Sequence, residues 1–347
     1  MLKIYKKIIL FSILSALTLS PFSIFAAGAV QPTTAPYKPL KIFYYREGKN
    51  ARASLYGNEL DIGVLAPQAY TFKTDGTLTG TMNQTVINYA LNKGIKLMPL
   101  VTNPNFSKAG AHSFLDDSSQ QDKAIDGLIA EAKTKGYWGW QIDFEQMDLS
   151  YRDKFSAFVQ KFGDQMKANG LVSSVAVVSK FSENPSDYVK TLWQDLIGVY
   201  DYSALASHTD FLSIMSYDDP DSEGPVARYS WLKKVMDYTL TLVPKEKVSM
   251  GLAFYYWLWN DTTGKIVEIG GNGGIQEALK KHYMTSGFDV AEQAPYFKYT
   301  SNKKKYTLWY ESGRSIQAKL DLMKKYRLAG FSAWALGLEV PSVKKVL

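Results

Sequence analysis

Short apolar runs alternate with amphipathic stretches along most of this chain, and this alternation restricts its fold more than any other feature. Strands buried beneath a layer of helices read as continuous apolar runs, whereas the covering helices repeat apolar residues every three or four positions. Eight candidate strands follow this pattern: Lys41–Tyr45, Ile62–Ala66, Lys96–Thr102, Trp138–Phe144, Ser173–Val178, Phe211–Ser216, Val248–Phe254 and Gly330–Ala335. Eight units in one domain favour closure, so we predict an α/β fold, a (β/α)8 TIM barrel, over an open doubly wound sheet.

Helical patterns are clearest over Gln120–Lys135, Arg152–Asn169 and Ser315–Tyr326. The alternation breaks once, over residues 255–308, which hold Gly/Asn turns and many aromatic residues. We therefore predict a barrel over 41–254 and 309–347, with residues 255–308 as a small α+β insertion between the seventh strand and its following helix.

The first residues have the pattern of an export signal. Lys3, Lys6 and Lys7 precede an apolar run over 8–19, and small residues at 26–28 offer a cleavage site. The run is shorter than the roughly 20 residues of a membrane span. We predict a signal peptide over 1–27, an extended leader over 28–40, no stable membrane anchor and an exported protein, either extracellular or periplasmic. An uncleaved N-terminal anchor is the alternative.

Composition excludes several kinds of chemistry. The chain has no cysteine, which rules out disulfides, thiolate metal sites and a cysteine nucleophile. Its three histidines lack metal-ligand spacing, so we expect neither a metal nor another cofactor. The net charge of +7, three charges of which belong to the export signal, would suit an anionic polymer such as a bacterial cell wall. No nucleic-acid motif is present, and we expect a monomer that binds no nucleic acid.

The segment 136–145 (GYWGWQIDFE) carries the most information about function. A strand alternates its faces, which puts three polar side chains on one face: Gln141, Asp143 and Glu145. The other face is apolar: Trp140, Ile142 and Phe144. The apolar face should meet the helices, and the polar face should point into the barrel.

Two inward carboxylates are costly to bury and cannot both ionise cheaply. One of Asp143 and Glu145 should therefore keep a proton near neutral pH, as a general acid for glycosidic cleavage requires. Glu145 lies nearer the mouth of the barrel and is the better candidate. Periodicity alone leaves an alternative open, in which both acids cap a helix or form salt bridges at a strand–helix junction.

The same segment resembles the strand-four signature of glycoside hydrolase family 18, DGxDxDxE, which ends in the catalytic acid. Gly139, Asp143 and Glu145 match this pattern, whereas Trp138 and Gln141 replace its first and middle acids. Three further segments resemble the family's sixth, seventh and eighth strands: Met215–Asp218 (MSYD), Lys247–Tyr255 and Gly330–Glu339, with Trp334 at the position of a sugar-stacking tryptophan. The resemblance covers roughly residues 41–340.

Within the family, two segments are similar to spore-germination and cell-wall members that hydrolyse peptidoglycan: Gly94–Asn103 and Trp309–Lys319. Such members commonly carry an amide at the middle motif position, as Gln141 does here. They often also carry LysM modules, which this chain lacks. The resemblance thus favours peptidoglycan, with chitin or N-glycans as alternatives.

The resemblance implies a retaining, substrate-assisted mechanism on an N-acetylglucosamine-containing polysaccharide. Glu145 would donate the proton, Asp143 would hydrogen-bond the acetamido N–H and Tyr217 would fix the acetamido group. The implied substrate-binding residues are Trp334, Gln141, Met215, Asp218 and Tyr255. A non-catalytic sugar-binding barrel is the alternative of a different class, although such proteins usually lack the catalytic glutamate.

The amide at position 141 has a further consequence. Gln141 can donate one hydrogen bond to Asp143 but cannot exchange a proton with it. We therefore expect Asp143 to stay ionised over a wider pH range than in a full acidic triad.

Overall fold

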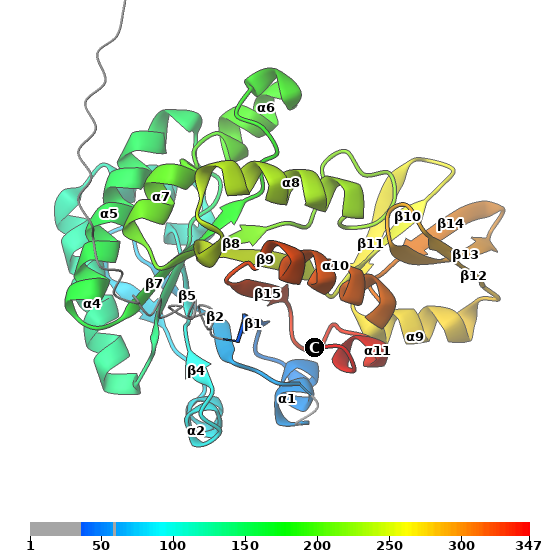
Figure 1. Ribbon diagram of the computed structural model, residues 1–347, viewed down its shortest axis with the longest axis horizontal. Helices are drawn as coiled ribbons and strands as arrows, with labels where there is room; N and C mark the ends of the chain where they lie inside the picture. The colour runs from blue at the N-terminus through cyan, green and yellow to red at the C-terminus, as the bar shows by residue number, and fades with distance from the viewer. Residues whose placement is uncertain (1–35, 58–59) are drawn as a thin grey trace, which may run out of the picture. The chain divides into compact units, whose positions relative to one another are not determined.

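The computed structural model describes residues 36–57 and 60–347. The predicted signal peptide and the predicted leader up to residue 35 lie outside the described residues. Lys38–Leu347 forms one compact unit. Within it, a closed barrel of parallel strands is surrounded by helices, and a second, smaller sheet extends from one end (Figure 1). The predicted fold class is confirmed.

The barrel is closed because its first strand, β1, pairs in parallel with both the second strand, β2, and the last, β15. Ile42 of β1 lies opposite Val64 on one side and Ser332 on the other. The barrel strands are β1 (Leu40–Tyr45), β2 (Val64–Phe72), β4 (Lys96–Leu97) with β5 (Leu100–Thr102), β6 (Gly139–Asp143), β7 (Val172–Val178), β8 (Phe211–Met215), β9 (Val248–Ala253) and β15 (Gly330–Trp334). A short strand, β3 (Leu78–Gly80), extends β2 in antiparallel pairing.

Two strands differ from the prediction. The predicted strand Ile62–Ala66 starts and ends later, as β2 over Val64–Phe72. The predicted strand Lys96–Thr102 is divided into β4 and β5 at Met98 and Pro99. Pro99 has no backbone N–H to contribute to a ladder, which accounts for the division.

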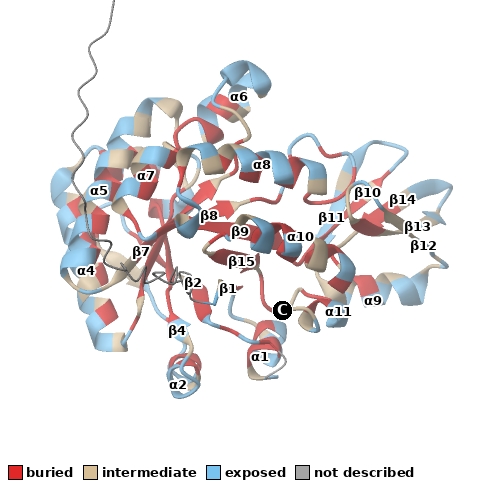
Figure 2. Ribbon diagram, viewed as in Figure 1, coloured by how far each residue is buried: buried red, intermediate tan, exposed pale blue. Residues whose placement is uncertain are grey.

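Helices cover the barrel with one face buried, as the red segments of the helices in Figure 2 show. α4 begins after Asp117, whose side chain accepts the backbone N–H groups of Ser119 and Gln120, and it ends at Gly136 in the left-handed region (φ 71°). The helices of the barrel layer are α1 (Lys49–Tyr56), α2 (Gln84–Asn92), α3 (Lys108–Leu115), α4 (Ser118–Lys135), α5 (Arg152–Ala168), α6 (Lys190–Leu192), α7 (Tyr202–His208), α8 (Tyr229–Leu242), α10 (Gly313–Tyr326) and α11 (Pro341–Lys344). Across the described ranges, none of the helices has both the length and the apolar character of a membrane span.

The smaller sheet lies between β9 and α10 in the chain, where an α+β insertion is expected. Its five antiparallel strands run in the order β11-β10-β14-β13-β12. The elements are β10 (Tyr256–Asn260), β11 (Lys265–Gly270), α9 (Asn272–Lys281), β12 (Thr285–Asp289), β13 (Ala294–Ser301) and β14 (Lys304–Trp309).

Polar contacts join the insertion to the loop that follows β8 and to the start of α8. The indole N–H of Trp259 donates to the carbonyl oxygen of Gly224 at 2.7 Å, and the Glu292 carboxylate accepts the backbone N–H of Ser230 at 3.0 Å. A buried ion pair between Glu311 and Lys319 ties the chain after β14 to α10. The smaller sheet is therefore anchored beside the mouth of the barrel.

Candidate active site

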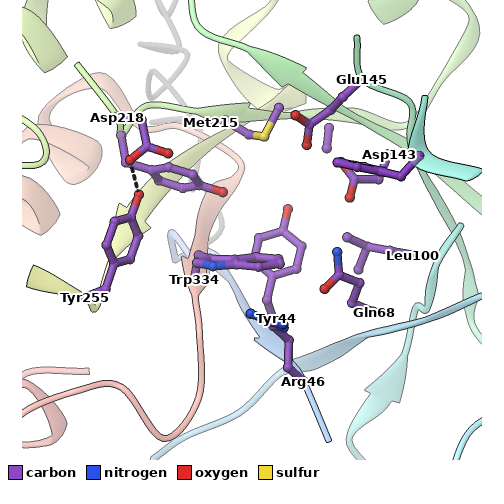
Figure 3. A pocket seen from close by; sticks show the side chains of 13 residues that line it. Tyr44, Arg46, Gln68, Leu100, Asp143, Glu145, Met215, Asp218, Tyr255 and Trp334 are labelled. Carbon is purple, nitrogen blue, oxygen red and sulfur yellow. Dashed lines mark hydrogen bonds between the residues drawn. The ribbon is translucent and has the colours of Figure 1, made fainter. Parts of the chain in front are cut away.

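A cavity of about 360 Å³ lies at the carboxyl ends of the barrel strands, where barrel enzymes hold their active sites (Figure 3). All eight barrel strands, or the residues shortly after them, contribute to its wall. The lining residues are Tyr44, Arg46, Gln68, Leu100, Phe106, Asp143, Glu145, Ala176, Met215, Tyr217, Asp218, Tyr255 and Trp334.

Strand β6 has the two faces that its sequence predicts. On the outer face, the indole N–H of Trp140 donates to the carbonyl oxygen of Leu128 in α4 at 2.9 Å. Phe144 packs among aromatic rings, including Phe158 of α5 with ring centroids 5.5 Å apart. On the inner face, Asp143 and then Glu145 point toward the cavity (Figure 3).

Burial and a neighbouring negative charge raise the pKa of both acids. Desolvation is the main cause for Asp143 and the charge of Glu145 the second, and together they raise its pKa to about 8. Burial, followed by the charge of Asp218, raises the pKa of Glu145. The pair therefore keeps a proton at neutral pH, and Asp143 ionises only toward alkaline pH. The comparison of its ionised range with that of a full acidic triad stays a prediction.

Gln141 lies beneath the cavity rather than in its wall. Its side chain is fully buried, its Oε1 accepts from the hydroxyl of Tyr44 at 2.8 Å and its Nε2 donates to Ser174 Oγ at 2.9 Å. In the part of the chain that the structure describes, no side chain donates a hydrogen bond to Asp143. The predicted donation from Gln141 to Asp143 is thus incorrect, because the amide of Gln141 is turned toward Ser174 instead. Gln141 is also too deep to touch a substrate directly.

A chain of hydroxyl groups fills the barrel below the cavity. Tyr44 Oη lies 2.9 Å from Ser213 Oγ, Ser213 lies 2.5 Å from Ser332, and Ser332 lies 2.6 Å from Ser249. Barrel interiors are usually filled by branched apolar side chains. Here small hydroxyl residues bond one another instead, and burial raises the pKa of Tyr44, so that its hydroxyl remains a donor.

Asp218 and two tyrosines form the wall that faces Glu145. The hydroxyl of Tyr255 donates to Asp218 Oδ1 at 2.6 Å, and the ring of Tyr217 meets that of Tyr255 edge-on at 6.2 Å. Asp218 has a φ of 58°, a left-handed conformation that short polar side chains tolerate better than bulky ones. Burial of the carboxylate raises its pKa, and the hydrogen bond from Tyr255 offsets part of that rise.

Trp334, at the end of β15, forms the floor of the cavity. Its ring lies 5.2 Å from that of Tyr44, and its indole face lies between Glu145 on one side and Arg46 on the other (Figure 3). An open aromatic face suits the apolar face of a sugar ring.

Seven of the eight predicted site residues line the cavity, and Gln141 is the exception. Six lining residues were not predicted: Tyr44, Arg46, Gln68, Leu100, Phe106 and Ala176. A signal existed for two of them. Tyr44 and Arg46 are two positions apart at the carboxyl end of the first candidate strand, so they share a face at the end where barrel sites form.

A second cavity of about 130 Å³ adjoins the first. Glu145, Met215, Tyr217 and Asp218 line both cavities. The rest of the second wall is mostly apolar and comes from the end of β7 and the segment after it, from the loop after β8 and from α8: Val178, Ser179, Phe181, Tyr188, Leu192, Leu196, Ile197, Pro220 and Trp231. Glu145 therefore stands where the two cavities meet.

A proton-holding carboxyl pair beside an open indole face, at the mouth of a (β/α)8 barrel, is the arrangement of a sugar-cleaving acid catalyst. The fold and the site define a barrel glycosidase. The family model described as glycosyl hydrolases family 18 matches residues 44–339, and the chain belongs to this family. The protein is accordingly a glycosidase.

Individual relatives agree with this assignment. The chain is 27% identical over 295 residues to the uncharacterized glycosylase YvbX of Bacillus subtilis (strain 168), a match that covers 82% of this chain and 84% of that protein. It is 27% identical over 291 residues to the cortical fragment-lytic enzyme of the same organism, covering 79% of this chain and 64% of that protein. The structure resembles the chitinase from Chromobacterium violaceum ATCC 12472, with a TM-score of 0.79, 26% identity and coverage of 89% and 98% of the two chains.

Proposed function

We propose that this glycosidase cleaves the β-1,4 bond on the reducing side of N-acetylglucosamine in peptidoglycan, with the substrate's own acetamido group as nucleophile. The observation that carries the proposal is the position of Glu145 between two cavities. A sugar in the first cavity and a leaving group in the second would place the bond between them beside the carboxyl group of Glu145.

Glu145 would donate a proton to the leaving oxygen and then accept one from the incoming water. Its raised pKa supports the first role, because a carboxyl group must be protonated near neutral pH to act as an acid. Burial and the charge of the nearby Asp218 both oppose ionisation of Glu145.

The acetamido carbonyl of the bound sugar would attack the anomeric carbon and form an oxazolinium ion, the route by which this family departs from the usual pair of carboxylates. A hydrogen bond from the acetamido N–H would favour the ionised form of Asp143, whose negative charge would in turn favour the protonated form of Glu145. Asp143 would then stabilise the positive charge as it develops. Tyr217, whose pKa burial raises well above its ordinary value, would keep its hydroxyl proton and hold the acetamido oxygen.

Two observations support peptidoglycan as the substrate. Relatives with similar sequences include cortical fragment-lytic enzymes. The middle motif position holds an amide, Gln141, which strengthens the resemblance to cell-wall members of the family. Chitin is the second candidate, supported by the likeness to a chitinase over most of both chains. We also propose that residues 1–27 direct export, since a cell-wall substrate lies outside the cytoplasm.

Mass spectrometry of products from purified peptidoglycan sacculi tests the proposal. Wild-type protein should release glycan fragments with N-acetylglucosamine at the new reducing end, and Glu145→Gln should release none. Proton NMR of the first product should show retention at the anomeric carbon. An inverted anomer would exclude the acetamido mechanism, and cleavage of chitin with intact sacculi would favour the second candidate.

A further inference from the structure

Arg46 is the one cation among the described residues that line the 360 Å³ cavity. It follows β1 directly, and its guanidinium group reaches the cavity on the side of Trp334 that lies away from Glu145 (Figure 3). The acids Asp143, Glu145 and Asp218 occupy the opposite part of the wall. The cavity thus has an acidic end, where the bond would break, and a basic end beyond the aromatic floor.

The guanidinium of Arg46 has no hydrogen bond or ion pair with any of the described residues. The acid next to it in the chain, Glu47, is already engaged, because its Oε1 accepts from Arg52 Nε at 2.5 Å and from the hydroxyl of Tyr45 at 3.0 Å. An arginine presents five donors in a planar fork that matches a carboxylate. All the hydrogen-bond donors of Arg46 therefore remain available to an anion that enters the cavity.

The backbone that carries Arg46 is held in place, although the side chain itself is exposed. Tyr44, two residues earlier, is buried in the hydroxyl chain of the barrel interior, and β1 is paired on both sides. Arg46 also lines a neighbouring depression formed by residues 46–51 and 335–338, so it stands at the junction of the two hollows. A glycan that extends past Trp334, away from Glu145, would pass this side chain.

The second cavity, on the leaving-group side, has the opposite character. No arginine, lysine or histidine belongs to the described residues that line it, and two of them, Glu145 and Asp218, are acids. An anionic substituent on the leaving group would meet apolar walls and carboxylates there. The charges of the site therefore favour an anion only at the Arg46 end.

We propose that Arg46 binds a carboxylate carried by the sugar on the non-reducing side of the one that stacks on Trp334. This inference rests on the proposed function and narrows its substrate class to acidic glycans. In peptidoglycan that neighbouring sugar bears a 3-O-lactyl group, whose carboxylate is free in peptide-stripped strands and amide-bonded to a stem peptide in intact ones. Arg46 would bind a carboxylate in both cases. This carboxylate belongs to the lactyl group in stripped strands and to the stem peptide in intact ones.

The test compares kcat/KM on three glycans: neutral chitohexaose, peptide-stripped peptidoglycan strands and strands that keep their stem peptides. Arg46→Gln should lower the ratio of kcat/KM for an acidic glycan to that for chitohexaose by about tenfold, the loss expected for one charge-assisted contact. The loss should shrink as salt is added, because the contact is exposed. A lower ratio only on stripped strands identifies the lactyl carboxylate, and one only on intact strands identifies the stem peptide.

Lys73→Gln is the matched control. Lys73 follows β2 at the same end of the barrel, is exposed and lines neither cavity, so its substitution removes one charge without touching the site. For Lys73→Gln, the ratio of kcat/KM for an acidic glycan to that for chitohexaose should equal the wild-type ratio. Equal losses on neutral and acidic glycans with Arg46→Gln, or the same fall in the ratio with Lys73→Gln, would overturn the proposal.

Binding measurements keep this test separate from that of the proposed function. Calorimetry on Glu145→Gln, alone and combined with Arg46→Gln, should show about tenfold weaker binding of acidic glycans in the double variant and a smaller change for chitohexaose. If wild-type protein cleaves none of the three glycans, the proposed function fails, while this comparison of affinities still decides whether Arg46 binds the carboxylate.

Discussion

The inner and outer faces of the barrel wall use opposite chemistry on the same strands. On β6, the outward side chains of Trp140 and Phe144 are completely buried against the helices, where they meet mostly apolar groups. The inward side chains of Gln141 and Asp143 are almost as deeply buried, but they meet hydroxyl groups and another carboxyl group. Equal burial therefore has different consequences on the two faces.

On the outer face, burial removes apolar surface from water and stabilises the fold. On the inner face, burial of Asp143 opposes its charge and costs stability at neutral pH, because the folded protein must hold the proton or pay for desolvation. Side chains that lower stability in this way are characteristic of sites shaped for chemistry. Substitutions on the two faces should thus separate stability from activity.

The largest expected effect is on activity alone. Glu145→Gln keeps the shape of the side chain but removes the proton donor, so kcat on a glycan substrate should fall by about 10³- to 10⁴-fold. The melting temperature, measured by calorimetry, should not fall, because the variant also removes a buried ionisable group. The control Glu246→Gln changes an exposed acid near the start of β9 and should behave as wild type. A Glu145→Gln variant that retained more than a tenth of the activity would contradict the assignment.

The second effect is on stability alone. Phe144→Ala on the outer face removes a ring that packs against Phe158 and its neighbours, and should lower the free energy of unfolding by about 3–4 kcal/mol. Chemical denaturation measures this loss. The folded fraction should retain kcat within about threefold, because Phe144 lies between Asp143 and Glu145 but faces away from them. A loss of kcat comparable to that of Glu145→Gln would show that the two faces are not independent.

The third effect is a gain in stability, whereas most substitutions of buried residues lower the free energy of unfolding. The folded pKa of Asp143, about 8, lies above its ordinary value, so wild-type stability should fall as pH rises from about 4 to about 8 and then level off. Asp143→Asn removes this loss, and at pH 9 the variant should be more stable than wild type by about 2–4 kcal/mol, while its activity falls. Unfolding curves at pH 4, 6 and 9 give the comparison. If the free energy of unfolding changed with pH in the same way for both proteins, the pKa of Asp143 would not be raised.

The smallest effect concerns the wall that faces Glu145. Tyr255→Phe removes the hydroxyl that donates to Asp218, so the pKa of Asp218 should rise and less negative charge should remain beside Glu145 near neutral pH. The alkaline limb of the pH–rate profile should then move to lower pH, and kcat/KM should fall about three- to tenfold. Tyr256→Phe, which removes the neighbouring hydroxyl that donates to Glu268, is the control. An unshifted alkaline limb would mean that Asp218 does not influence Glu145.

Much of the fold could be predicted because its signals are local. The continuous apolar runs of the strands and the three- and four-residue spacing of the helices survive in the structure with shifts of one or two residues at most ends. The larger shift at β2 and the break at Pro99 depend on pairing with neighbouring strands. The two faces of β6 were likewise predictable, since alternation along a strand is a property of the backbone.

The sequence by itself determined the barrel, the acids Asp143 and Glu145 on one strand face and, through its resemblance to a family, most of the cavity wall. Only the tertiary structure decided which partner Gln141 takes, how far burial raises the pKa of Asp143, where a second cavity forms and that Arg46 reaches the first cavity without a partner. The reason is physical. Alternation and spacing act within one segment, whereas hydrogen-bond competition, desolvation and the juxtaposition of charges arise only when the sheet closes and brings different strands together.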